Sequence, residues 1–129
     1  MNETLKNTLD AMENASEAWY RLPVRLFGNR DMRHFIATAE GNGMINAGIH
    51  DGDNLVFVAT DTPDNFSIVY AILDNGEKFC RRYIKEGEKI RFRREDGVTP
   101  DVVVDKCQII GQMVSLIRNF PRMQEVAAG

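Results

Sequence analysis

Cysteine and histidine are scarce in this 129-residue sequence, which contains two of each. Cys80 and Cys107 have no CxxC spacing and make a poor metal site, so we expect no metal and no other cofactor. Disulfides are not needed either, because 43% hydrophobic residues supply enough apolar material for the core of one domain. We therefore expect both thiols to be free and buried, in a reducing compartment.

Long apolar runs and an excess of basic charge are also missing. No run approaches the roughly 20 apolar residues of a transmembrane helix. The N-terminus carries acids where a secretory signal carries bases. The formal net charge of −3 argues against a surface that binds nucleic acid. These absences predict a cytoplasmic protein that contacts neither a membrane nor, directly, nucleic acid.

The first part of the chain has the apolar spacing of one helix. Over residues 4–19, apolar residues recur in steps of three and four, at Leu5, Leu9, Met12, Ala15 and Trp19. Thr4 is expected to cap the start of this helix and Pro23 to end it. One helix of this length is marginal alone. Its apolar stripe therefore packs on its own domain or docks on a partner.

After Pro23 the pattern changes to strands. Residues 54–59 are continuously apolar, as in a strand buried on both faces. The other expected strands are 34–39, 66–73, 78–84, 89–95, 101–105 and 107–117. Asn75-Gly76 predicts a hairpin turn, and Gly111 inside the last strand predicts a bulge. The fold class is therefore mainly β, an antiparallel β domain with one N-terminal helix.

Residues 40–53 read EGNGMINAGIHDGD, a loop that is rich in glycine but poor in reactive groups. The loop has no nucleophile, no set of metal ligands and no phosphate-binding lysine. Asp51-Gly52-Asp53 is typical of a turn. A metal site or an acid–base pair is the alternative reading of its two carboxylates.

Three segments, the first of which contains this loop, resemble one known family. The segments are GNGMINAGIHDGDNLVFV (41–58), IVYAILDNGEKFCRRYI (68–84) and IIGQMVSLI (109–117). Together they resemble the catalytic domain of the LexA and UmuD self-cleaving proteins, which is related to the signal peptidases. The positions in register with the family's loop are Met44, Gly48, Ile49, Gly52 and Asp53. The resemblance implies an N-terminal helical segment (1–21), a LexA/UmuD-like peptidase-type β domain (22–118) and a C-terminal tail (119–129).

The resemblance also places the family's reactive positions on residues that lack the required chemistry. Gly43 stands where the family has its nucleophilic serine, and Asn42 replaces the Asp before it. Arg81, followed by Arg82, stands where the family has its general-base lysine. Glycine has no side chain to attack a carbonyl, and arginine stays protonated and cannot accept a proton. The alternatives are unusual chemistry or a loop that simply needs a glycine turn at residue 43.

These replacements predict a catalytically inactive regulatory protein that acts by binding. The resemblance implies a homodimer, with the strand around residues 109–117 as the candidate edge, and the edge residues are Ile109, Ile110, Met113, Val114 and Leu116. It also implies a role in the SOS response to DNA damage, in prophage control or in transcription regulation. The partner would be a repressor, an active homologue or a DNA polymerase. The alternative is an active self-cleaving Ser-Lys peptidase and SOS transcriptional repressor of the same family.

The densest basic region allows a third reading, a transcription regulator whose basic strand touches DNA. Its cations are Arg81, Arg82, Lys85, Arg91, Arg93 and Arg94, and acids are interleaved with them. That mixture favours a solvated strand. Arg81 is the exception, because at the position of the base its guanidinium must find a carboxylate or carbonyl partner. Lys78 is expected on the opposite strand face. A Cys–His nucleophilic pair using His34 or His50 is a further alternative.

Overall fold

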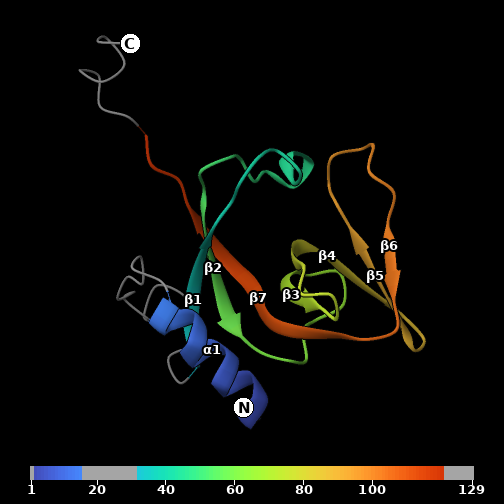
Figure 1. Ribbon diagram of the computed structural model, residues 1–129. Coiled ribbons are helices and arrows are strands. Elements are labelled where there is room, and N and C mark those ends of the chain that lie inside the picture. Colours follow the sequence, from blue (N-terminus) through green and yellow to red (C-terminus); the bar gives the residue numbers. More distant parts are fainter. Residues whose placement is uncertain (1, 16–31, 121–129) are drawn as a thin grey trace.

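The computed structural model describes residues 2–15 and 32–120 (Figure 1). Within these ranges, seven strands form one sheet in the order β1-β2-β7-β3-β4-β5-β6, and every neighbouring pair is antiparallel. The strands are β1 (His34–Thr38), β2 (Asn54–Ala59), β3 (Ile68–Leu73), β4 (Lys78–Glu86), β5 (Lys89–Arg93), β6 (Val102–Val104) and β7 (Cys107–Ile117). With helix α1 (Glu3–Ala15) at the N-terminus, the expected mainly β fold is confirmed.

Helix α1 packs on its own sheet. Leu5 and Leu9 are buried and belong to one apolar cluster with residues of β1 and β2. The cap residue is Asn2, whose Oδ1 accepts a hydrogen bond from the backbone N–H of Leu5 at 2.6 Å. The prediction of Thr4 as the cap is therefore wrong, because the helix begins at Glu3. Residues 16–23, with the expected end of the helix, lie outside the described residues. No helix within the described ranges is long and apolar enough to span a membrane.

The sheet curves around two apolar clusters, and β7 runs through both (Figure 1). The first lies under α1 and contains Phe35 and Phe57, whose rings stack at 5.1 Å. The second lies between β3, β4 and β5 and contains Phe79 and Phe92. The loop that joins β1 to β2 belongs to the first half of the sheet, and the basic strands β4 and β5 belong to the second.

Strand β7 is central in the sheet, which corrects the prediction that it is an edge. Residues 107–112 pair with β3, and residues 111–117 pair with β2. Ile109 and Ile110 are buried and cannot form an edge. Only the end of β7, which carries Met113, Val114 and Leu116, pairs with β2 alone among the described strands.

Two irregularities bend β7. The register against β3 passes from Gly111 to Ile109, which leaves one extra residue beside Gly111 and confirms the predicted bulge. The register against β2 skips Val114 in the same way. A Cβ on Gly111 would lie 2.7 Å from the Phe35 ring and 2.8 Å from the carbonyl oxygen of Val58. Glycine is therefore required there by close packing.

Candidate functional site

The loop between β1 and β2 holds its shape through glycines with left-handed backbone. Gly41, Gly48 and Gly52 have φ angles of 77°, 83° and 86°, which side chains strongly disfavour. Gly48 caps a short 3₁₀ helix, Ile45–Ala47. Gly43 is not among the glycines with positive φ. The backbone thus does not require glycine at residue 43, which counts against the glycine-turn alternative.

A buried carboxylate anchors the loop to the end of β7. Asp53 is only 1% exposed. Its two oxygens accept hydrogen bonds from Nε and Nη2 of Arg118, each at 2.8 Å, and Arg118 also donates to the carbonyl of Gly48. The hydrogen bond from Arg118, with another from the backbone N–H of His50, lowers the pKa of Asp53 to about 2. The carboxylate thus closes a turn and anchors a strand end, and sequence reasoning missed Arg118.

Asp51 has a turn role as well, since its Oδ1 accepts a hydrogen bond from the backbone N–H of Gly41 at 2.6 Å. In the part of the chain that the structure describes, no group of three or more His, Cys, Asp or Glu side chains is arranged to hold a metal ion. The metal alternative for Asp51 and Asp53 therefore has no structural support.

The loop is also fastened to the residues that follow β5. The backbone N–H of Asn46 donates to the carbonyl of Glu95 at 2.8 Å. The backbone N–H of Glu95 contacts Sδ of the buried Met44 at 3.3 Å. These contacts join positions about fifty residues apart in sequence. They bring Arg94, the neighbour of Glu95, onto the loop.

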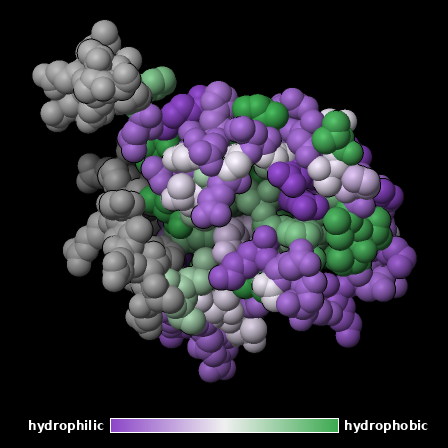
Figure 2. All heavy atoms as spheres, turned by 45° about the horizontal axis from the view of Figure 1, so that its top comes forward, coloured by the Kyte–Doolittle hydropathy of each residue, from purple (hydrophilic) through white to green (hydrophobic). Residues whose placement is uncertain are grey.

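A cleft of about 520 Å³ lies between the loop and strand β4. Gly43 and Arg81, the positions that the resemblance assigns to nucleophile and base, both line it. Lining residues also come from the end of β1, from the start of β4 and from Arg94. In Figure 2 much of the face turned toward the viewer is hydrophilic, and hydrophobic residues show in its middle and at its right side among the hydrophilic ones.

Arg94 occupies the space in which a side chain at residue 43 would project. A Cβ built on Gly43 would lie 2.1 Å from Nε of Arg94 and 2.7 Å from its Cζ. The Arg94 side chain is 41% exposed, and its ion pair with Asp96 is long, at 3.4 Å. Sequence reasoning placed Arg94 on a solvated strand. No local signal marks it, because its position depends on the contacts between Glu95 and the loop.

Arg81 lies in the cleft without the expected polar partner at one of its nitrogens. Its guanidinium stacks over the Phe79 ring, with Cζ 4.0 Å from the ring centroid. Its Nη1 atom is buried and has no hydrogen-bond partner among the described residues. Burial, and then the charge of Arg94, lower the pKa of Arg81. The side chain nevertheless stays a cation near neutral pH.

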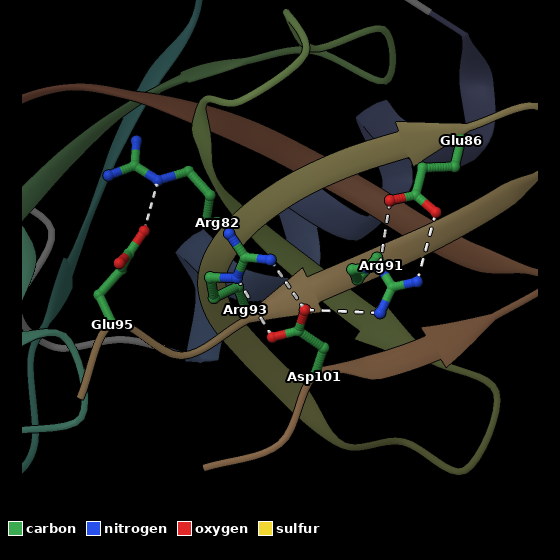
Figure 3. A network of polar contacts seen from close by, with 6 residues as sticks. All are labelled: Arg82, Glu86, Arg91, Arg93, Glu95 and Asp101. Atoms are coloured by element: carbon green, nitrogen blue, oxygen red, sulfur yellow. Dashed lines mark hydrogen bonds and ion pairs between the residues drawn. The ribbon is translucent and has the colours of Figure 1, made fainter. Parts of the chain in front are cut away.

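The other arginines of β4 and β5 are paired with carboxylates (Figure 3). Arg82 pairs with Glu95 at 2.9 Å. Arg91 and Arg93 converge on Asp101, and Arg91 also pairs with Glu86. This network favours the solvated-strand interpretation over a nucleic-acid surface.

Other reactive groups near the cleft lack activation. Cys80 lines the cleft, but burial raises the pKa of its thiol to about 12. Thr38 lines it too, and its hydroxyl is hydrogen-bonded to Asn54 at 3.1 Å. Lys78 lies on the opposite face of β4 from Arg81, as expected, and it is nevertheless another lining residue of the cleft. Both faces of β4 reach the cleft, Lys78 and Cys80 on one and Arg81 on the other.

Both cysteines are free, as expected, although they are half-buried rather than buried. The histidine alternative has no support in the cleft, because neither His34 nor His50 is among its lining residues. A nucleophile with a nearby base is therefore not assembled by any of the described side chains that line this site.

An antiparallel β domain in which a glycine-rich loop faces a basic strand across a cleft fits a peptidase-type domain. Comparison with known proteins gives the family: the sequence profile described as Peptidase S24-like matches residues 6–114, and the chain belongs to this family. The resemblance drawn from the loop is thereby confirmed. The match begins before residue 22 and includes most of α1, whereas the proposed boundary after residue 21 stays a prediction.

The chain is similar to several proteins named LexA repressor. It is 34% identical over 109 residues to that of Limosilactobacillus reuteri strain DSM 20016, covering 84% of this chain and 51% of the relative. It is 33% identical over 109 residues to that of Pediococcus pentosaceus, covering 84% and 51%. It is 32% identical over 118 residues to that of Clostridium botulinum strain Langeland, covering 91% and 57%. The chain thus spans about half the length of these curated relatives.

Proposed function

We propose that this chain is a noncatalytic member of the S24-like family that regulates other proteins by holding an extended peptide segment in its cleft. One observation carries the proposal: the guanidinium of Arg94 occupies the space that a Cβ on Gly43 would need. At the position that the resemblance gives to the nucleophile, a cation fills the space of the missing side chain.

The chemistry of a Ser-Lys dyad needs an attacking oxygen and a neutral amine beside it. Gly43 supplies no oxygen, and Arg81 is a cation that cannot accept a proton. Lys78 also lines the cleft, but it is exposed on the other face of β4, where its ammonium stays hydrated. A single restoring substitution therefore leaves the dyad incomplete.

Strand β1 offers a place for an extended peptide. It is the first strand of the sheet and pairs only with β2 among the described strands. Its end, at Ala37 and Thr38, lines the cleft together with Ala39 and Glu40. Backbone groups on the outer edge of β1 can pair with a peptide while its side chains reach the cleft.

Homodimerisation through the end of β7 forms the second part of the proposal. Residues 113–117 pair with β2 on one side only, and Val114 and Ile117 are exposed apolar residues. A second copy could continue the sheet there. Because the relatives are named repressors, we place the chain in SOS, prophage or transcriptional control in the cytoplasm. Its partner would be a repressor, an active homologue or a DNA polymerase.

The absence of catalysis is tested with the purified chain. Incubation for a day at pH 7 to 10, read by intact mass spectrometry, is expected to show no new fragment. A fluorophosphonate probe is expected to label neither the wild type nor the Gly43→Ser variant, because that variant has no base. Time-dependent cleavage of the wild type would instead support the self-cleaving peptidase.

Peptide binding is tested by hydrogen exchange with capped extended peptides of alternating valine and threonine. Slower exchange of the amides of β1 and the loop is expected on binding. Unchanged exchange across β1 at saturating peptide would refute strand addition. Sedimentation of the wild type against a Val114→Lys variant tests the dimer, which the charge should dissociate.

A further inference from the structure

The side chains that line the cleft carry an excess of positive charge. Its ionisable lining side chains include three cations, Lys78, Arg81 and Arg94, and one carboxylate, Glu40. The whole chain has a formal net charge of −3. Positive charge is therefore concentrated at this site against the overall balance of the protein.

The two arginines of the cleft, Arg81 on β4 and Arg94 directly after β5, differ in their polar partners from the arginines outside the cleft. Arg82, Arg91 and Arg93 each form an ion pair with a carboxylate at 3.2 Å or less. Arg81 has a buried Nη1 with no hydrogen-bond partner among the described residues. A buried donor without an acceptor is costly, so an acceptor that reaches this nitrogen would gain a hydrogen bond from a group that is already desolvated.

Arg94, the second arginine that lines the cleft, also carries a guanidinium whose N–H groups can donate hydrogen bonds. Among the described residues, its carboxylate contact is the 3.4 Å ion pair with Asp96. That carboxylate is already held by the hydroxyl of Thr99 and by the backbone N–H groups of Val98 and Thr99. Arg94 also raises the electrostatic energy of Arg81, since two cations face the same space. An anion between them would relieve that repulsion.

We infer that Arg81 and Arg94 form a carboxylate-binding site at Gly43, which selects extended peptides with an Asp or Glu side chain beside the end of β1. The inference rests on the proposed peptide-binding function and adds its specificity. Gly43 contributes by leaving room for Arg94, and Phe79 supports Arg81 from below the guanidinium plane. Planar guanidinium groups bind carboxylates with paired, charge-assisted hydrogen bonds.

The experiment compares two capped peptides that differ only in whether the central side chain ends in a carboxylate or in an amide. Both alternate valine and threonine, and the central residue is Glu in one and Gln in the other. Binding is measured by calorimetry at 50 mM and 300 mM salt. We expect the Glu peptide to bind about tenfold more tightly at low salt, as charge-assisted hydrogen bonds predict. That advantage is expected to shrink at high salt.

Variants then locate the effect. Arg81→Gln and Arg94→Gln should each reduce the preference for the Glu peptide to about twofold or less, while binding of the Gln peptide is retained. The matched control is Arg93→Gln, next to Arg94 in sequence but outside the cleft lining and paired with Asp101. This control should keep the full preference. Circular dichroism melting checks that each variant is folded.

The outcomes separate this inference from the proposed function. Equal binding of the two peptides to the wild type refutes the carboxylate site and leaves peptide binding standing, and this comparison needs no variant. A preference that survives both cleft substitutions, or is lost in Arg93→Gln, also refutes it. Binding of neither peptide refutes the inference and the peptide-binding function together. A phosphoserine peptide that outcompetes the Glu peptide would reassign the site to phosphate.

Discussion

Replacing each of two glycines by alanine tests whether residue 43 is free to carry a side chain. Gly43 and Gly111 both lack the positive φ that excludes other residues, so strain of the backbone does not enter. Each substitution adds one methyl group. The neighbours differ: a partly exposed guanidinium at Gly43, and a buried ring with a backbone carbonyl at Gly111.

At Gly111 the new Cβ would lie 2.7 Å from the Phe35 ring and 2.8 Å from the carbonyl oxygen of Val58, where ordinary contact begins at 3.4 Å. The Phe35 ring has little room to move away from the new methyl group, because it stacks on Phe57 and contacts the Tyr70 ring edge-on. Overpacking of this kind costs about 1–3 kcal/mol. Alanine also lowers the conformational entropy of the unfolded chain, which stabilises the folded state by about 0.4–1 kcal/mol. The net cost is then about 0–2.6 kcal/mol. At about 4 °C per kcal/mol for a chain of this size, the Tm should fall by up to roughly 10 °C.

At Gly43 the same methyl group meets the end of a flexible side chain. Moving Arg94 sacrifices a surface ion pair worth about 0–1 kcal/mol. The gain from the unfolded chain is about 0.4–1 kcal/mol and is of similar size. The Gly43→Ala variant should therefore match the wild type within about 1 kcal/mol. Urea and thermal unfolding measure both variants.

Gly41→Ala supplies the control for backbone conformation. Its φ is 77° and no atom lies within 4 Å of a Cβ there, so any loss of stability comes from the left-handed backbone alone. A Gly43→Ala variant that is destabilised as much as Gly111→Ala would refute the reasoning. Arg94 would then be held rigidly, and glycine at residue 43 would be a requirement of the fold.

Three further predictions concern the buried groups. Asp53 has a pKa of about 2 in the folded protein, below its usual 3.8, so its stabilisation is fully present above about pH 4 and is lost as the pH falls toward 2. Asp53→Asn should lower stability at pH 7 and flatten this acid limb in urea unfolding, and an unchanged pH profile would contradict the anchor. Leu9→Ala should cost about 2–5 kcal/mol, because Leu9 is fully buried under the sheet. The exposed Asn7→Ala control should stay within about 0.5 kcal/mol in the same assay. Burial raises the pKa of the Cys80 thiol to about 12, so in a Cys107→Ser background it should react with Ellman's reagent at pH 8 far more slowly when folded than in urea. Equal rates would show that the thiol is accessible.

The fold was predictable from sequence because each strand has a strong local pattern. Three features lie close to their predicted positions: the hairpin at Asn75-Gly76, the doubly buried β2 and the bulge at Gly111. The order of strands was not predictable in the same way. That β7 inserts between β2 and β3 depends on pairings between residues far apart in sequence, and so its edge role was assigned wrongly to Ile109 and Ile110.

In the candidate site, too, the features with a local sequence pattern were predictable, and those that depend on tertiary contacts were not. The turn glycines of the loop could be predicted from the local sequence. The placement of Gly43 and Arg81 at one cleft could be predicted from the resemblance to the family motif. Arg94 and Arg118 reach the loop only through tertiary contacts, and neither has a sequence neighbourhood that differs from an ordinary charged surface. Charge alternation over residues 89–95 favours a solvated face and does not indicate that Arg94 lies against Gly43.

The contact of Arg118 with both Asp53 and Gly48 has a thermodynamic consequence. Arg118 directly follows the end of β7, where we propose that a second copy pairs, and it fixes the loop that forms one wall of the cleft. An assembly step that shifts Arg118 therefore changes the affinity of the cleft for its ligand. Linkage makes this effect reciprocal, so the ligand must change the monomer–dimer equilibrium by the same factor. One coupling free energy would then describe both the effect of dimerisation on ligand binding and the effect of the ligand on dimerisation.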